Sequence, residues 1–271
     1  MGGHDKFGAS STFAERYETT LVPVIFRPWA RELIRRIVPE SGERILDLAC
    51  GTGAVGREVF ASGVEPGVLI GADISEGMLE VARSRASEAG IEAEYLQASA
   101  DNLPFPDNSF DVAFCQQALQ FFADRPAALR ELKRVLAPGG RTVFCVSRKL
   151  ELNPLLKAQA ATLDKYAGRD AGNAVRAICA FDDEQALRRL FQDAGMAEIE
   201  IESVTLTPSH PDGRAFARGA MGGMHTGDKM SRMSEEERNE SIEYFMAGLG
   251  SCFDGVGIKF PHVSYIVTAR A

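Results

Sequence analysis

Short apolar runs alternate with longer amphipathic segments through the middle of the chain. Each run has the length of a strand, and a glycine or proline ends each of the intervening helical segments. The predicted strands are Arg44–Ala49, Val68–Asp73, Ala93–Gln97, Phe110–Cys115 and Arg141–Val146. Strands that are apolar throughout are typical of a parallel sheet covered by helices on both faces. The pattern therefore predicts a doubly wound α/β core.

Two further runs complete the predicted sheet. After a helix that Asp183 caps and Gly195 ends, Ala197–Leu206 alternates apolar and acidic residues, as an antiparallel strand does. Val263–Ala269 is the natural seventh strand, although roughly 55 residues separate it from the sixth, where a hairpin loop needs only about two to five. We expect seven mainly parallel strands, an antiparallel last strand and an insertion before it.

Helical patterns occupy the rest of the chain. Residues 12–37 place apolar side chains at near-helical spacing, and Pro23 and Pro28 are expected to break this stretch into short helices. Segments 150–180 and 207–261 also contain helical patterns, and they are expected to form a lid beside the sheet edge where ligands bind. The predicted parts are an N-terminal helical flap (1–43), a core (44–149), lid helices (150–180), a core helix and sixth strand (181–206), a lid insertion (207–261) and the last core strand (262–271).

Composition narrows the classes of partner. The 271 residues include 30 basic and 38 acidic side chains, so the formal net charge of -8 disfavours nucleic acid. No apolar run approaches the roughly 20 residues of a membrane span, and the polar N-terminus lacks a signal core, so a cytoplasmic location without membrane contact is expected. The five cysteines are widely spaced in apolar surroundings, which predicts reduced thiols.

A glycine-rich turn joins the first predicted strand to the following helix. Gly51 and Gly53 allow a ligand to approach the backbone closely at this turn. Asp73 ends the second strand 22 residues after Gly51, where a carboxylate can accept hydrogen bonds from both hydroxyls of a ribose. A nicotinamide dinucleotide site has the same spacing, and Gly56 supplies the third glycine that such a site needs. These residues alone leave the cofactor open.

Three segments together resemble the class I methyltransferases that use S-adenosylmethionine (SAM), and in particular their ubiquinone- and menaquinone-biosynthesis branch. They are 47–53, 71–79 and 98–112, and the resemblance covers 44–146. It implies a Rossmann-like methyltransferase fold, SAM as cofactor and S-adenosylhomocysteine as product. The segment around Leu103-Pro104-Phe105 has no counterpart in nicotinamide-dependent oxidoreductases, which makes that alternative the weaker one. The cofactor residues that the resemblance implies are Tyr17, Asp47, Ala49, Gly51, Gly53, Asp73, Ile74, Met78, Ser99, Ala100 and Gln116.

The chain departs from this family at two of these positions. Ala49 replaces a commoner glycine beside the methionine moiety, and Ser99 replaces an acidic residue that holds the adenine amino group in relatives. Asp101 is a candidate substitute for that acid, and a turn or capping role is the alternative. Tyr17 resembles the position that closes over the methionine carboxylate, with an apolar helix contact as its alternative.

The acceptor of the methyl group is less defined. The Asn-Pro-Pro-aromatic signature of base-modifying methyltransferases is absent after the fourth strand, which favours a small organic acceptor. The apolar content of the lid segments indicates a partly hydrophobic one, methylated on oxygen, nitrogen or carbon. His225 is a candidate base, and no cluster of metal ligands is evident, so metal-free chemistry is expected. A protein that binds SAM without consuming it is an alternative, and the oligomeric state is not predicted.

Overall fold

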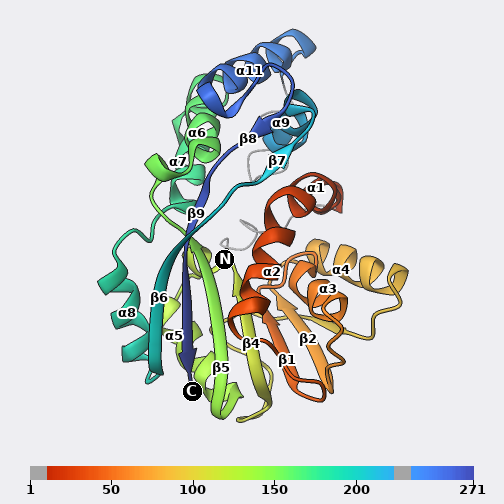
Figure 1. Cartoon of the computed structure of the whole chain (residues 1–271), viewed down its shortest axis with the longest axis vertical. Coiled ribbons are helices and arrows are strands. Elements are labelled where there is room, and N and C mark those ends of the chain that lie inside the picture. The colour runs from red at the N-terminus through yellow and green to blue at the C-terminus, as the bar shows by residue number, and fades with distance from the viewer. Residues whose placement is uncertain (1–10, 223–232) are drawn as a thin grey trace, which may run out of the picture.

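A seven-stranded sheet forms the centre of the molecule. The computed structural model describes residues 11–222 and 233–271. The strands are β1 (Arg44–Leu48), β2 (Val68–Asp73), β3 (Glu94–Gln97), β4 (Phe110–Gln116), β5 (Leu136–Ser147), β6 (Ala197–Leu206) and β9 (His262–Arg270). Their order is β3-β2-β1-β4-β5-β9-β6, and β9 runs antiparallel to both of its neighbours (Figure 1). The seven predicted strands, the mainly parallel sheet and the antiparallel last strand are confirmed.

Alternate residues of each central strand pack against opposite layers of helices. Ile45 and Val143 belong to the core under α2 (Arg27–Arg36) and α3 (Ala54–Ala61), whereas Leu46 and Phe144 belong to the core under α5 (Arg125–Val135) and α8 (Glu184–Asp193). The helix α4 (Glu76–Glu88) covers β2 and β3 beside α3 (Figure 1). Because helices cover both faces of the central strands, most residues of β1 and β4 are buried, whereas the edge strand β6 alternates apolar and acidic residues and is largely exposed.

The N-terminal stretch is one continuous helix, so the predicted breaks at Pro23 and Pro28 are wrong. It runs from α1 (Ser11–Arg16) through the π-helix η1 (Tyr17–Phe26) into α2. Pro23 lies inside the π-helix, where the amide of Arg27 bonds back to the carbonyl of Val22, and Pro28 lies in the first turn of α2. The wider π turn accommodates a proline that would clash with the carbonyl of a regular α-turn, and a first-turn proline loses no needed donor.

A helical layer lies beyond the carboxyl ends of the parallel strands. It contains α6 (Pro154–Tyr166), α7 (Arg169–Ile178), α9 (Gly213–Gly222) and α11 (Glu235–Gly248), which Figure 1 shows above the sheet. A small β7–β8 pair, Ser209–His210 with Ile258–Lys259, leads into and out of the insertion; the sequence pattern did not predict it. Short 3-10 turns occupy Leu119–Phe121 (η2), Leu150–Leu152 (η3) and Gly250–Cys252 (η4).

Two further predictions concern disulfide bonds and membrane-spanning helices. All five cysteines are free thiols, three of them buried and Cys179 and Cys252 partly exposed, which confirms that they form no disulfide. In the part of the chain that the structure describes, no helix has the length and apolar character needed to cross a bilayer.

Candidate active site

A cavity of about 290 Å³ opens at the carboxyl edge of the sheet. The ends of β1, β2 and β4 form its floor, the N-terminal helix forms one side, and α6, α7 and α9 contribute side chains from above. Nine of the eleven residues predicted to bind the cofactor line it: Tyr17, Ala49, Gly51, Asp73, Ile74, Met78, Ser99, Ala100 and Gln116. Residues far apart in the sequence thus meet at the edge where α/β folds bind their ligands.

Asp73 fixes the glycine-rich turn at the floor of this cavity. Its Oδ2 accepts the amide of Gly51 at 2.8 Å, and its Oδ1 accepts the amide of Ser75 at 2.9 Å. Gly51 has φ +55°, and a Cβ built there would meet no atom within 4 Å, so the turn leaves open space beside the carboxylate. Each carboxylate oxygen keeps a lone pair, so Asp73 can hold the turn and also accept hydroxyl groups from a ligand.

Ala49 and Gly53 adopt left-handed conformations on either side of Gly51. Ala49 has φ 56°, which carries a steric cost for any residue with a Cβ, so the alanine at this usual glycine position is held in a strained backbone. Gly53 does not line the cavity; a Cβ on it would lie 2.8 Å from the hydroxyl of Tyr95. Close packing on Tyr95 therefore explains the glycine at position 53, and its contact with cofactor stays a prediction.

Asp47 lies behind the turn and is 1% exposed. Among the described residues, neither of its carboxylate oxygens has a hydrogen-bond partner. Burial raises the pKa of this carboxyl to about 7, because the charged form loses its water; the nearby backbone amide of Gly56 and the charge of Arg57 offset this loss only in part. Asp47 is therefore a poorly solvated carboxyl in the core beneath the cavity, outside the cavity wall itself.

The rim near β3 carries the residues expected around an adenine. Ile74 is 53% exposed at the mouth, and Met78 follows in the first turn of α4, whose N-cap is Ser75. Ser99 and Asp101 both line the cavity, and the Ser99 hydroxyl donates to Asp101 Oδ1 at 2.5 Å. This contact places a carboxylate beside the position where relatives carry one.

Tyr17 projects from the N-terminal helix into the same end of the cavity. Its ring packs on Phe26 with 4.8 Å between ring centroids and on Phe13 with 6.5 Å. Burial raises the pKa of the Tyr17 hydroxyl well above 10, and the nearby carboxyl of Asp73 adds to the effect. Tyr17 thus remains a neutral hydroxyl facing the turn.

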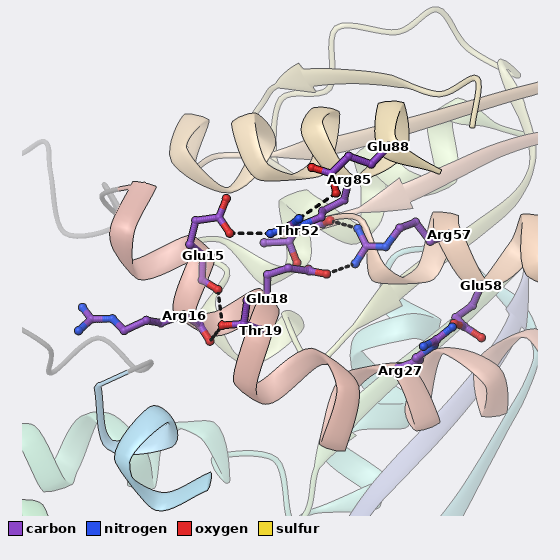
Figure 2. A network of polar contacts seen from close by, with 10 residues as sticks. All are labelled: Glu15, Arg16, Glu18, Thr19, Arg27, Thr52, Arg57, Glu58, Arg85 and Glu88. Atoms are coloured by element: carbon purple, nitrogen blue, oxygen red, sulfur yellow. Dashed lines mark hydrogen bonds and ion pairs between the residues drawn. The ribbon is translucent and has the colours of Figure 1, made fainter. Parts of the chain in front are cut away.

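Ion pairs fasten the N-terminal helix to the core (Figure 2). Glu18 pairs with Arg57 of α3 at 2.7 Å, and Glu15 pairs with Arg85 of α4 at 2.7 Å. Arg57 also donates to the carbonyl of Thr52 in the glycine-rich turn at 2.5 Å. A single guanidinium therefore ties the helix that carries Tyr17 to the turn that Tyr17 faces.

We expect Arg57→Met to loosen this helix. The side chains of Glu18 and Arg57 are 12% and 17% exposed, so the variant leaves a half-buried carboxylate without its cation, which costs about 1–3 kcal/mol. Amide hydrogen exchange in 13–26 should accelerate, and cofactor affinity should fall roughly tenfold. Arg35→Met is the control, because Arg35 is mostly exposed and its partner Glu32 keeps a second cation, Arg36. Equal exchange rates in both variants would contradict the role of Arg57.

The cavity has two parts of different chemistry. The near half is lined by Asp73, Ile74 and Ser99, and the far half lies under the helical layer. The far half combines apolar residues with uncharged polar ones: Leu21, Ile25, Gln116, Gln120, Phe121, Leu155, Leu156, Gln159, Ile178, Ala220 and His262. No Lys or Arg of the described ranges lines any part of the cavity. An anionic group on a ligand would find no cation here.

Among the described residues, His262 is the histidine that lines the cavity. His225 falls outside the described residues, so its role as a base stays a prediction. His262 is 5% exposed, and its Nδ1 accepts a hydrogen bond from the indole of Trp29 at 3.0 Å. Sequence reasoning missed His262, Gln120 and Gln159. The available signal was the orientation of the last strand: an antiparallel strand brings its first residue, His262, to the carboxyl edge.

The cavity fits SAM at its near half. Asp73 offers oxygen acceptors next to the open space at Gly51, and an apolar rim of Ile74 and Met78 borders the Ser99–Asp101 turn. Bound there, SAM supplies a methyl group on a positively charged sulfur.

Comparison with known proteins agrees with this geometry. Residues 46–144 match the methyltransferase domain family. The demethylmenaquinone methyltransferase of Clavibacter sepedonicus is 35% identical over 73% of this chain and 84% of its own length. The chain belongs to the class I SAM-dependent methyltransferases. The ubiquinone/menaquinone biosynthesis C-methyltransferase of Cronobacter sakazakii is 33% identical over 67% of this chain and 77% of its own length.

Solved structures show the same fold. Phosphoethanolamine N-methyltransferase 2 of Haemonchus contortus, in complex with SAM, matches with a TM-score of 0.62 at 18% identity over 96% of this chain and 57% of that one. The [4+2]-cyclase SpnF matches with a TM-score of 0.55 at 21% identity over 90% of this chain and 80% of that one. The sequence relatives identify the chain as a SAM-dependent methyltransferase, and the nicotinamide alternative is set aside.

Proposed function

We propose that this methyltransferase acts on a ring carbon of an uncharged, hydroxylated aromatic acceptor, of the hydroquinone type. The observation that carries the proposal is the wall of the far half, which is apolar and carries neutral amide and imidazole groups without a cation. Such a wall suits an aromatic ring with hydroxyl groups and penalises a carboxylate or phosphate. The names of the two curated relatives, which describe methylation in quinone biosynthesis, support the same class.

The proposed cofactor contacts follow the near half of the cavity. Asp73 accepts the ribose hydroxyls, while Ile74 and Met78 flank the adenine. The amide of Ala100 meets a ring nitrogen, and the Ser99–Asp101 pair replaces the usual acid at the adenine amino group. Tyr17 covers the methionine moiety, and Gln116 borders the methyl group. The remaining contacts proposed on resemblance are those of Asp47, Ala49, Gly51 and Gly53.

The protein's own contribution to methyl transfer is alignment and exclusion of water. An in-line displacement at a methyl carbon needs the acceptor atom held close to that carbon, which is worth several kcal/mol of the barrier. The N-terminal helix and the helical layer, which we propose act as flap and lid, enclose the two ligands on opposite sides. His225 remains a proposed base.

The test is an acceptor panel with methyl-labelled SAM. We expect label to enter a ring carbon of an unmethylated naphthohydroquinone, with S-adenosylhomocysteine formed one for one. Phosphoethanolamine and transfer RNA should receive none, because both carry phosphate. Conversion of the acceptor into an unlabelled product, with no rise in S-adenosylhomocysteine, would show that SAM is not consumed. Methylation of the charged acceptors alone would refute the proposed class.

The setting of this activity is also a proposal. The net charge of -8 supports a protein that does not bind nucleic acid. We place the enzyme in the cytoplasm without membrane contact, and a fractionation of cells into membrane and supernatant tests this.

A further inference from the structure

Trp29 fixes the protonation pattern of His262. The indole nitrogen of Trp29 is a donor only, so Nδ1 of His262 must be the unprotonated nitrogen that accepts its hydrogen bond. In a neutral imidazole the proton then resides on Nε2. Trp29 is fully buried, and no side chain of the described residues other than Trp29 forms a hydrogen bond with His262. The cavity therefore faces a ring whose remaining polar group is an N–H donor.

Three glutamines keep hydrogen-bond acceptors free, whereas His262 keeps a donor free. The amide nitrogens of Gln116, Gln120 and Gln159 donate to the main-chain carbonyls of Phe26, Gln117 and Ala220 at 2.8, 3.0 and 3.5 Å. A carbonyl accepts only from a donor, so each amide must turn its nitrogen to the backbone and keep its oxygen free. In the described part of the chain, the side-chain oxygens of Gln116 and Gln120 are buried without any partner.

A fourth glutamine shows that this pattern is selective. Gln117 is also buried, and its oxygen accepts from Ser147 while its nitrogen donates to Ser264 at 2.8 Å. Both the oxygen and the nitrogen of the Gln117 side chain therefore have partners inside the protein. Gln116 and Gln120 each keep an unpaired acceptor, although a buried acceptor without a partner destabilises the fold. A ligand that donates to them recovers the free energy lost in this way.

We propose that His262 is a positioning residue that donates from Nε2 to an oxygen of the methyl acceptor, while Gln116 and Gln120 accept its hydroxyl hydrogens. The site then selects an uncharged acceptor that carries both a hydrogen-bond-accepting oxygen and an O–H group. This inference rests on the proposed function, because it assigns the far half of the cavity to the methyl acceptor. Burial lowers the pKa of His262 to about 4, in keeping with a donor that does not act as the base.

Redox-stable phenols and ketones test the two halves of the pattern separately. Binding to the full chain loaded with S-adenosylhomocysteine is measured for 4-hydroxyacetophenone (donor and acceptor), 4-ethylphenol (donor only), 4-methoxyacetophenone (acceptor only) and 4-hydroxybenzoate (anionic). His262→Phe should weaken both ketones roughly tenfold and leave 4-ethylphenol unchanged. Gln120→Met should weaken the binding of 4-hydroxyacetophenone and of 4-ethylphenol by a similar factor and leave that of 4-methoxyacetophenone unchanged. In the wild type, 4-hydroxybenzoate should bind most weakly.

Two further variants separate positioning from folding. His262→Gln keeps an N–H near the Nε2 position and should restore part of the ketone affinity. Trp29→Phe removes the indole donor, and ¹⁵N spectra of histidine should then show His262 leaving the pure Nε2–H tautomer. Affinity for S-adenosylhomocysteine serves as the folding control in every variant. The proposal would be overturned if His262→Phe weakened the binding of 4-ethylphenol as much as that of 4-methoxyacetophenone. It would also be overturned if wild-type His262 were protonated on Nδ1.

The outcome is distinguishable from a failure of the proposed function. If the naphthohydroquinone receives no methyl group while the four probes follow the predicted order, the hydrogen-bonding pattern stands and the acceptor class is wrong. If methylation occurs but none of the probes binds to the wild type, the pattern assigned to His262 and the glutamines is refuted.

Discussion

Asp73→Asn should lower the affinity for SAM about 100-fold or more. Asp73 accepts the amides of Gly51 and Ser75 through its two oxygens, and the proposed ribose hydroxyls approach the same carboxylate. An asparagine turns an NH₂ group toward one of these donors, so the variant loses charge-assisted hydrogen bonds worth about 1.5–3 kcal/mol each. Two such bonds correspond to the expected loss, and calorimetric titration with SAM measures it.

The control for this variant is Asp111→Asn. Asp111 pairs with Arg44 at 2.7 Å and does not line the cavity, so its neutralisation should leave SAM affinity within about threefold of the wild type. Asp101→Asn adds a comparison within the cavity and should weaken SAM roughly tenfold, because an adenine amino group donates one hydrogen bond. Wild-type affinity in Asp73→Asn would refute the assignment of the ribose.

The near half of the cavity was predictable because its residues follow strand ends. Asp73 ends β2 and Ser99 follows β3 by two residues, and parallel strands bring their carboxyl ends to one edge. Periodicity and spacing therefore indicate which loops meet, and the resemblance to a family adds the ligand. The same reasoning predicted the helical insertions, because their residues repeat at helical spacing.

The far half was not predictable in this way. Gln120 and Gln159 lie on separate helical segments whose packing on the sheet depends on tertiary contacts that no local pattern encodes. His262 begins an antiparallel strand, and its role depends on a contact with Trp29, 233 residues earlier in the chain. The prolines of the N-terminal helix led to a wrong prediction of helix breaks, because a π-helix accommodates Pro23 where an α-helix would break. Long-range packing decided the cases of the glutamines and His262, and a local change of helix type decided that of Pro23.

Asp47→Asn should change how the stability of the protein depends on pH. In the unfolded chain this carboxyl has its ordinary pKa of 3.8, whereas burial raises the pKa to about 7 in the folded protein. Between these values the folded state holds a proton that the unfolded state has released, so wild-type stability falls as pH rises through this range and is level above it. The difference in pKa corresponds to about 4 kcal/mol. Asparagine does not ionise, so the variant should lack this part of the slope.

Denaturant unfolding without cofactor, at several pH values from about 4 to 8, measures the effect. Asp47→Asn should gain stability relative to the wild type as pH rises, and the gain should level off above about pH 7. Asp111→Asn provides a control of opposite sign, because Arg44 lowers the pKa of Asp111; that pair stabilises the fold at neutral pH and is lost as pH falls. A difference between Asp47→Asn and the wild type that is constant with pH would mean that Asp47 ionises normally in the fold. If the slope disappears in Asp47→Asn, the buried carboxyl lowers the free energy of unfolding at neutral pH. Natural proteins carry such stability costs at functional sites.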